Sequence, residues 1–291
     1  MFQSKANFKV TDSLPLILQI AHFLQHKGIK GGYHLEEVAR TRGWLDVLVR
    51  FRLRRDVSID IPAYADSYDL SNIPGYEHEL IGLIHSHISK SEKPVLLLDC
   101  GADIGLLSAL LVSACDCIDK VFAFEPNPRS FQRLERNLQL LPVDTEAKNV
   151  AVANFSGRGE LRYPEHDSDD HAAFIVPVEQ GDIPVVKIDE LDLASGCRVL
   201  CKIDVEGGEL AVIEGAQKTL SSSSEFTVVF EAHREQVKRT GIDPLKVVSL
   251  LNEFKKCKAV VAEEPDKVID FDYPFFEQFP NRIYNICVFS E

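Results

Sequence analysis

The sequence lacks an uncharged apolar run of the roughly 18 residues that a membrane-spanning helix needs. It also lacks a basic stripe, and its formal net charge of -13 disfavours the phosphate backbone of a nucleic acid as a partner. The seven cysteines include no C-x-x-C pair, which disfavours zinc and favours reduced thiols. No N-terminal signal is recognisable. These absences predict a cytoplasmic globular protein with no membrane span, no nucleic-acid partner and no metal site.

One short stretch carries most of the functional signal. Residues 95–98 are an apolar run that predicts a buried parallel strand, and this strand ends at Asp99. The chain then turns through Gly101, Ala102, Asp103 and Gly105 into the apolar residues 106–112, which predict a buried helix. A glycine turn in front of a helix N-terminus lets a nucleotide-like ligand approach the backbone closely.

The same turn lacks the features of the common phosphate sites. It has neither the G-x-G-x-x-G spacing of a dinucleotide site nor the Gly-Lys-Ser/Thr of a P-loop. It carries Asp103 and no lysine or arginine, so it disfavours phosphate and suits a cation. The next predicted strand ends on Glu125, about 20 residues later, where Rossmann-like sheets hold ribose hydroxyls. These features predict S-adenosylmethionine, a positively charged adenosine without phosphate, as the ligand.

Strand and helix patterns alternate along the rest of the chain and predict an open, mostly parallel α/β sheet with helices on both faces. The further strands are expected over residues 149–152, 198–204, 225–231, 258–262 and 282–289. Ligands bind at the carboxyl ends of such strands. Asp99, Glu125, Asp204 and Glu231 should therefore share one crevice, with Glu206 and His233 just beyond it.

The first ninety residues differ from the rest. They predict a helix capped by Asp12 that ends near Gly28, a second helix over residues 35–49, and a strand over residues 57–61. Six arginines between residues 40 and 55 make this the basic region of the chain. We therefore expect a mainly helical accessory segment over residues 1–90 and a cofactor-binding domain over residues 91–291.

Four motifs resemble, in order and spacing, those of the FkbM-type methyltransferases. They are DCGADIG at residues 99–105, AFEPNP at 123–128, KIDEL at 187–191 and KIDVEGGEL at 202–210. Tyr76 and Glu77 also resemble that family, which usually has asparagine at the position of Asp103. The resemblance implies the Rossmann-like class I methyltransferase fold, a mostly parallel sheet of seven strands with the last strand antiparallel, here with a helical N-terminal extension.

The resemblance also implies a set of cofactor-binding residues. Asp99 and Asp103 would face the aminoacyl end of S-adenosylmethionine, and Glu125 would accept both ribose hydroxyls. The backbone of Ala151 would border the adenine. Asp204 and Glu206 would lie where the methyl group meets its acceptor. The full set of implied cofactor-binding positions is Tyr76, Glu77, Asp99, Gly101, Ala102, Asp103, Gly105, Glu125, Pro126, Asn127, Ala151 and Asp204.

Members of this family are similar in methylating hydroxyl oxygens of sugars or polyketide-like products. The implied activity is O-methylation of a small hydroxyl-bearing acceptor, which needs a base to take the hydroxyl proton. His233 is the first candidate base, with Asp204 and Glu206 next, although a partly buried histidine satisfied by a neighbour is equally expected at position 233.

Three alternatives stay open. One is a nicotinamide-dependent oxidoreductase of the same fold class, which the missing third glycine and the acidic turn disfavour. The second is a non-catalytic cofactor-binding protein. The third is a methyltransferase in which Asp204 and Glu206 hold a metal ion. The sequence leaves the acceptor and the oligomeric state undetermined.

Overall fold

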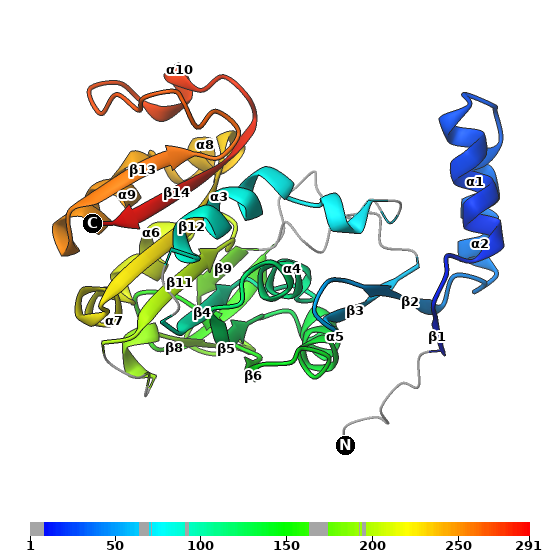
Figure 1. Cartoon of the computed structure of the whole chain (residues 1–291), viewed down its shortest axis with the longest axis horizontal. Helices are drawn as coiled ribbons and strands as arrows, with labels where there is room; N and C mark the ends of the chain where they lie inside the picture. The colour runs from blue at the N-terminus through cyan, green and yellow to red at the C-terminus, as the bar shows by residue number, and fades with distance from the viewer. Residues whose placement is uncertain are drawn as a thin grey trace. The chain divides into compact units, whose positions relative to one another are not determined.

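The computed structural model describes residues 9–63, 70, 72–90, 93–162, 174–191, 193 and 196–291 (Figure 1). The chain divides into two compact units, Met1–Tyr76 and Glu77–Glu291. Helix α3 (His78–Ile88), which the sequence pattern places in the N-terminal segment, thus belongs to the second unit.

The first unit combines a helix pair with a small sheet. Its elements are β1 (Lys9–Thr11), α1 (Leu16–His26), α2 (Gly32–Thr41), β2 (Val47–Arg52), β3 (Ser58–Pro62) and the 3-10 turn η1 (Ile73–Gly75). β2 lies between β1, to which it is parallel, and β3, to which it is antiparallel. The predicted helix over residues 35–49 is wrong in its second half, because Gly43 adopts a φ of 67° and the chain continues as β2. The residue at the start of α1 is Pro15 rather than Asp12.

The basic region contributes to the packing of this unit. Arg50 on β2 lies opposite Asp60 on β3 and donates two hydrogen bonds to its carboxylate, at 2.7 and 2.9 Å. Asp60 is only 1% exposed, so the pair neutralises a buried charge. Arg50 is therefore a structural residue of the small sheet.

The second unit contains the large sheet. Its strand order is β13-β14-β12-β11-β4-β5-β6. β14 is antiparallel to both of its neighbours, and the other contacts are parallel, which confirms the predicted seven-stranded sheet with an antiparallel last strand. The strands are β4 (Val95–Cys100), β5 (Ile118–Phe124), β6 (Asp144–Lys148), β11 (Arg198–Ile203), β12 (Glu225–His233), β13 (Cys257–Val261) and β14 (Ile283–Ser290).

Helices cover both faces of this sheet (Figure 1). One face carries α3, α4 (Leu106–Ala114) and α5 (Pro128–Leu138), and the other carries α6 (Glu209–Glu214), α7 (Gln217–Ser222) and α9 (Leu245–Phe254). The short helix α8 (Arg234–Thr240) directly follows β12, and the short helix α10 (Phe275–Gln278) directly precedes β14. Phe275 and Phe279 are fully buried and pack with Tyr284, as expected for core residues. Among the described residues, no helix is long and apolar enough to cross a bilayer.

Four strands between β6 and β11 in the sequence form a second, smaller sheet. Its order is β7-β10-β8-β9, formed by β7 (Ala151–Val152), β10 (Ile183–Val186), β8 (Gly157–Arg162) and β9 (Phe174–Pro177), and the turn η3 (Ile188–Glu190) follows it. The prediction that residues 149–152 form the third strand of the large sheet is therefore wrong. That place belongs to β6, an edge strand with the polar sequence DTEAK, which gives no hydrophobic signal.

Candidate active site

The glycine turn after β4 exists because two strand ends approach each other there. The Asp204 N–H donates to the Cys100 carbonyl at 2.9 Å, and a Cβ at position 101 would lie 1.8 Å from the Asp204 carbonyl oxygen. Gly101 and Gly105 also have φ values of 77° and 84°, which favour glycine. Gly105 then begins α4, so the turn places a helix N-terminus at the carboxyl end of the sheet.

Three acidic residues at this end of the second unit have left-handed backbones. The φ values of Glu77, Asp103 and Glu206 are 48°, 47° and 58°. Asparagine and aspartate adopt this conformation more readily than other non-glycine residues, so Asp103 occupies a position that also suits asparagine. Such strained backbones concentrate at functional sites, and here they accompany the predicted motifs.

Glu125 connects the glycine turn to α5. Its Oε2 accepts a hydrogen bond from the Asp103 N–H and its Oε1 accepts one from the Asn127 N–H, both at 2.8 Å. Burial, and then the charge of Asp103, raise the pKa of Glu125 to about 7. Asn149 donates to the Glu125 and Pro126 carbonyls at 2.7 and 3.1 Å and so fixes the loop from the other side. Asn149 was not predicted as a site residue, because the sequence pattern placed it at the start of a strand over residues 149–152.

Asp99 lies beneath the turn rather than at its surface. It is 1% exposed, its Oδ2 accepts a hydrogen bond from Ser108 Oγ at 2.6 Å, and its Oδ1 lies 3.3 Å from Lys202 Nζ. Lys202 Nζ also donates to the Gly101 carbonyl at 2.5 Å and lies 3.6 Å from Asp204 Oδ2. Lys202 therefore links the two strongest sequence motifs. The available signal was a lysine that follows the apolar residues 199–201 within strand β11.

Carboxyl groups gather at the ends of β11 and β12. Asp204 follows β11 at the level of Glu231, because Ile203 pairs with Phe230. Burial and then the charge of Asp204 raise the pKa of Glu206 to about 7 and that of Glu231 to about 8. Burial raises the pKa of Glu209 to about 7. Of the residues predicted to meet in or just beyond one crevice (Asp99, Glu125, Asp204, Glu231, Glu206 and His233), the structure brings Asp204, Glu206 and Glu231 close together here.

The remaining contacts fix the orientation of individual carboxylates. Gln236 Nε2 donates to Glu206 Oε2 at 2.9 Å, and the Gly207 N–H donates to Glu209 Oε1 at 2.9 Å. Glu77 Oε2 accepts from Asn285 Nδ2 at 3.0 Å, and burial raises the pKa of Glu77. Within the described residues, no group of three or more His, Cys, Asp or Glu side chains is arranged to hold a metal ion.

His233 caps a helix. It ends β12, and its Nδ1 accepts a hydrogen bond from the Glu235 N–H at 3.1 Å at the start of α8. A neutral ring with an accepting Nδ1 carries its proton on Nε2. Burial, and then the charge of Arg282, lower the pKa of His233. The geometry therefore gives this ring a structural partner and no accepting nitrogen for a substrate hydroxyl.

Four other predicted positions are also located by the structure. The Ala102 N–H donates to the Phe124 carbonyl at 3.0 Å, and Asn127 caps α5 by accepting from the Arg129 N–H at 2.9 Å. Ala151 is buried in β7 and pairs with β10. Tyr76 is the last residue of the first unit.

Residues 99–269, more than half of the chain, match the family model of the methyltransferase FkbM domain. The chain belongs to the FkbM methyltransferase family. Its cofactor is accordingly S-adenosylmethionine, as predicted. The family and the order of the seven strands together confirm the class I methyltransferase fold.

Similar proteins include one curated relative and several solved structures. The hexuronic acid methyltransferase AglP of Haloferax volcanii is 28% identical over 235 residues, which is 76% of this chain and 90% of that protein. The methyltransferase FkbM structure from Methylobacillus flagellatus is 17% identical with a TM-score of 0.49, and the match covers 75% of this chain and 50% of that one. The structure of M. jannaschii TYW2 in complex with AdoMet is 12% identical with a TM-score of 0.39, and the match covers 84% of each chain.

Proposed function

We propose that this FkbM-family methyltransferase methylates a hydroxyl oxygen of a small, sugar-like acceptor. The observation that supports this most directly is the half-buried Glu206, whose pKa lies near 7 at the carboxyl end of β11. An alcohol needs a base of about this pKa to take its proton, whereas an acceptor carboxylate needs none. The similarity to a hexuronic acid methyltransferase supports a sugar as the acceptor.

The residues at the glycine turn fit the cofactor. The buried carboxylate of Glu125 retains lone pairs beyond its two backbone hydrogen bonds and suits a pair of ribose hydroxyls. Residues 101–105 contain no cationic side chain that would hold a phosphate. Asp103 and Asp204 supply negative charge for a cationic end. Asp99, which is covered by Ser108 and Lys202, would act through the position of Lys202.

The chain then has two tasks in the transfer. S-adenosylmethionine supplies an already activated methyl group, so alignment and removal of one proton are what the protein must add. Gln236 holds Glu206 Oε2, which leaves Oε1 to accept the hydroxyl proton. Burial, and then the charge of Asp204, raise the pKa of Glu206 to about 7, near neutral pH, where a base is most effective.

The acceptor atom can be tested directly. The full-length chain is incubated with [13C-methyl]-S-adenosylmethionine and methyl glucuronoside, which offers both hydroxyls and a carboxylate. We expect a carbon signal at the chemical shift of a methyl ether. A methyl ester signal, or transfer only to nitrogen or carbon acceptors in a wider panel, would contradict O-methylation of a hydroxyl.

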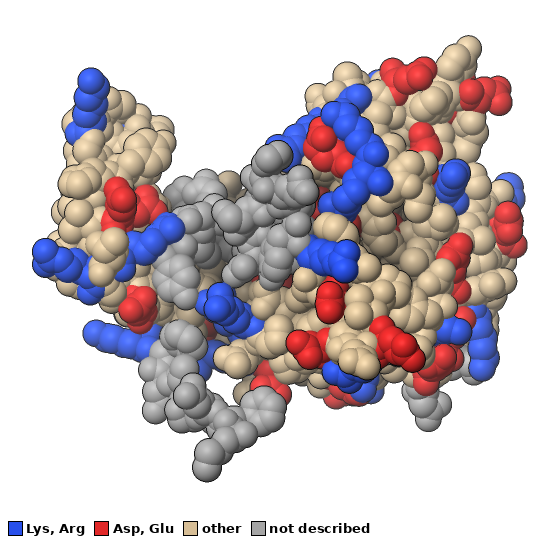
Figure 2. Space-filling model, turned by 180° about the vertical axis from the view of Figure 1, so that it is seen from behind, with Lys and Arg blue, Asp and Glu red and all other residues tan. Residues whose placement is uncertain are grey.

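Surface charge is consistent with a small acceptor. On the face of the second unit that Figure 2 shows, lysine and arginine side chains are interspersed with aspartate and glutamate. A continuous basic groove is what a nucleic-acid substrate favours. The cytoplasmic location expected from the sequence stays a prediction.

Cofactor affinity should depend on pH through Glu125. Its pKa of about 7 means that the free protein holds a proton there at lower pH, while ribose hydroxyls donate best to the ionised carboxylate. We expect S-adenosylmethionine to bind more tightly as the pH rises from about 6 to about 8, with proton release at the lower pH. Calorimetry in two buffers of different ionisation enthalpy measures that release. Glu125→Gln should abolish the release, and an unchanged release in this variant would assign it to another group.

A further inference from the structure

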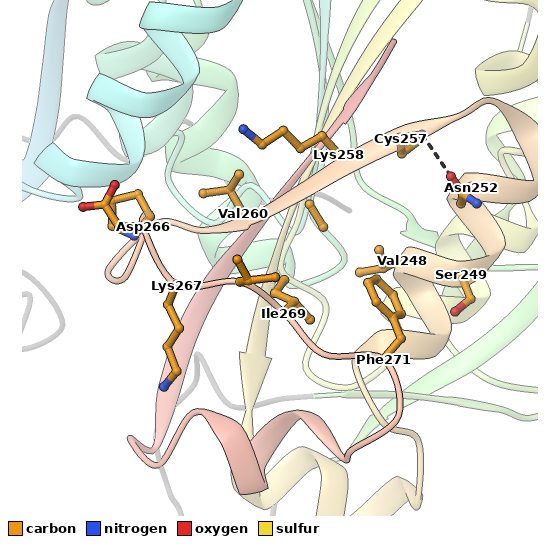
Figure 3. A pocket seen from close by; sticks show the side chains of 13 residues that line it. Val248, Ser249, Asn252, Cys257, Lys258, Val260, Asp266, Lys267, Ile269 and Phe271 are labelled. Carbon is orange, nitrogen blue, oxygen red and sulfur yellow. Dashed lines mark hydrogen bonds between the residues drawn. The ribbon is translucent and has the colours of Figure 1, made fainter.

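A groove runs along the outer edge of β13, the edge strand of the large sheet (Figure 3). It lies between α9 and the segment 265–271 and has a volume of about 720 Å³. That volume is within the range of small-molecule sites, about 300–1,000 Å³. Four residues of β13, 257–260, line the groove, and their three steps of about 3.3 Å span about 10 Å.

The walls of the groove combine apolar surface with polar groups. Ile269 and Phe271 extend from the segment toward β13 and α9, with Phe271 close to Val248 (Figure 3). Phe271 is 56% exposed, so its ring is available to a ligand. On the α9 side stand Ser249 and Asn252, whose Oδ1 accepts from the Cys257 N–H at 3.0 Å and whose amide NH₂ can still donate.

The edge strand adds backbone hydrogen-bonding groups. Among the described residues, β13 is the last strand in the sheet order and has no neighbour on its outer side. The Lys256 carbonyl accepts from the N–H of Glu291, just after β14, and the Ala262 N–H donates to the Asn285 carbonyl within β14. The alternation of an antiparallel ladder therefore directs the N–H and C=O of Ala259 outward, into the groove.

These walls favour one class of ligand over two others. A sugar presents C–H faces to an aromatic ring and hydroxyls to amide and backbone groups, and so matches both kinds of surface. An acyl chain would bury the Asn252 and Ala259 polar groups without partners. An added peptide strand is disfavoured because β13 is short and carries Lys258, a residue type that blunts edge strands.

The chain that leaves β13 joins one end of the groove to the residues beside the candidate active site. The Glu263 carboxylate accepts hydrogen bonds from the backbone N–H and side-chain amide of Asn285, and the same amide donates to Glu77. Pro265, which lines the groove, is only two residues further on, at most about 7.6 Å in Cα steps. An acceptor that extends from the carboxyl groups along this segment would reach the groove at Pro265.

We propose that this groove holds the distal sugar rings of the acceptor, so that the substrate is an oligosaccharide rather than a free monosaccharide. This inference rests on the proposed sugar acceptor. Phe271 is the stacking wall, and Ser249, Asn252 and the edge of β13 supply hydrogen bonds to hydroxyls.

The test compares two acceptors in steady-state methyl transfer by the full chain. They are methyl glucuronoside and a trisaccharide with the same glucuronate at its non-reducing end. We expect the wild-type enzyme to favour the trisaccharide about tenfold, through KM. Phe271→Ala should remove about that factor for the trisaccharide alone, as loss of one aromatic anchor does. Ser249→Trp, which fills the groove, should do the same.

Tyr273→Ala is the matched control, because Tyr273 is 58% exposed, two residues away and outside the groove. It should leave both acceptors unchanged. Equal losses of activity for both acceptors in Phe271→Ala, or no loss for either, would overturn the groove assignment.

If the wild-type chain methylates neither sugar, the proposed O-methylation of these sugars is wrong, and calorimetric binding of the trisaccharide then tests the groove separately. A trisaccharide affinity that Phe271→Ala weakens and Tyr273→Ala leaves unchanged supports the groove assignment. No binding to the wild-type chain, or the same affinity in Phe271→Ala, overturns it.

Discussion

Lys202→Met is expected to destabilise the second unit by about 3–5 kcal/mol, because it leaves a buried carboxylate without its counter-charge. Asp99 is 1% exposed, and Lys202 Nζ at 3.3 Å is the cation beside its Oδ1. The same ammonium holds the Gly101 carbonyl and lies near Asp204, so the glycine turn should loosen and cofactor affinity should fall as well. Denaturant unfolding and titration of S-adenosylmethionine measure the two effects.

Two variants distinguish the loss of the Lys202–Asp99 ion pair from the effect of removing any lysine. Lys187→Met removes an exposed lysine that lies 3.9 Å from Glu190, and should change stability by at most about 1 kcal/mol. The double variant Asp99→Asn/Lys202→Met removes both charges and should recover part of the lost stability. If Lys202→Met unfolds like the Lys187 control, the lysine does not hold the site together.

Glu206→Gln is expected to lower kcat by about 10²–10⁴-fold, the usual contribution of a general base, with little change in cofactor affinity. Glutamine preserves the size of the side chain and an oxygen that can accept from Gln236 Nε2. The base must be ionised, so wild-type kcat should rise with pH through the pKa of about 7, and this limb should disappear in the variant. Single-turnover methyl transfer across pH measures both.

His233→Ala is the comparison that decides between the two candidate bases. The ring caps α8, so its loss should cost about 1 kcal/mol of stability and change kcat by only a few-fold. A large loss of kcat in His233→Ala, with Glu206→Gln fully active, would restore the histidine as the base and remove the glutamate from the mechanism.

The parts of the fold that the sequence predicted are those with strong local patterns. β4 is an apolar strand bounded by proline and glycine, and Asn127 with Pro128 marks the start of α5. β6 escaped prediction because an edge strand needs no apolar side chains. The helix expected over residues 35–49 failed at Gly43, where a positive φ ends the helix and lets β2 begin.

In the candidate active site, too, the residues within local motifs were predictable, and those whose role depends on distant parts of the sequence were not. Glu125 and Asp204 were predictable because each follows a strand within a recognisable motif. The role of Lys202 depends on Asp99 and Gly101, which lie about a hundred residues away in the sequence. The groove along β13 likewise requires α9, the edge strand and the segment 265–271 to meet, which no local pattern encodes.

The most direct test of the cofactor site is calorimetric titration of S-adenosylmethionine, its demethylated product and NAD into the wild-type chain and Glu125→Ala. We predict micromolar binding of both sulfur compounds, no binding of NAD, and a loss of at least about tenfold in affinity in the variant. Binding of NAD alone, or sulfur-compound affinities that Glu125→Ala leaves unchanged, would contradict the site described at the glycine turn.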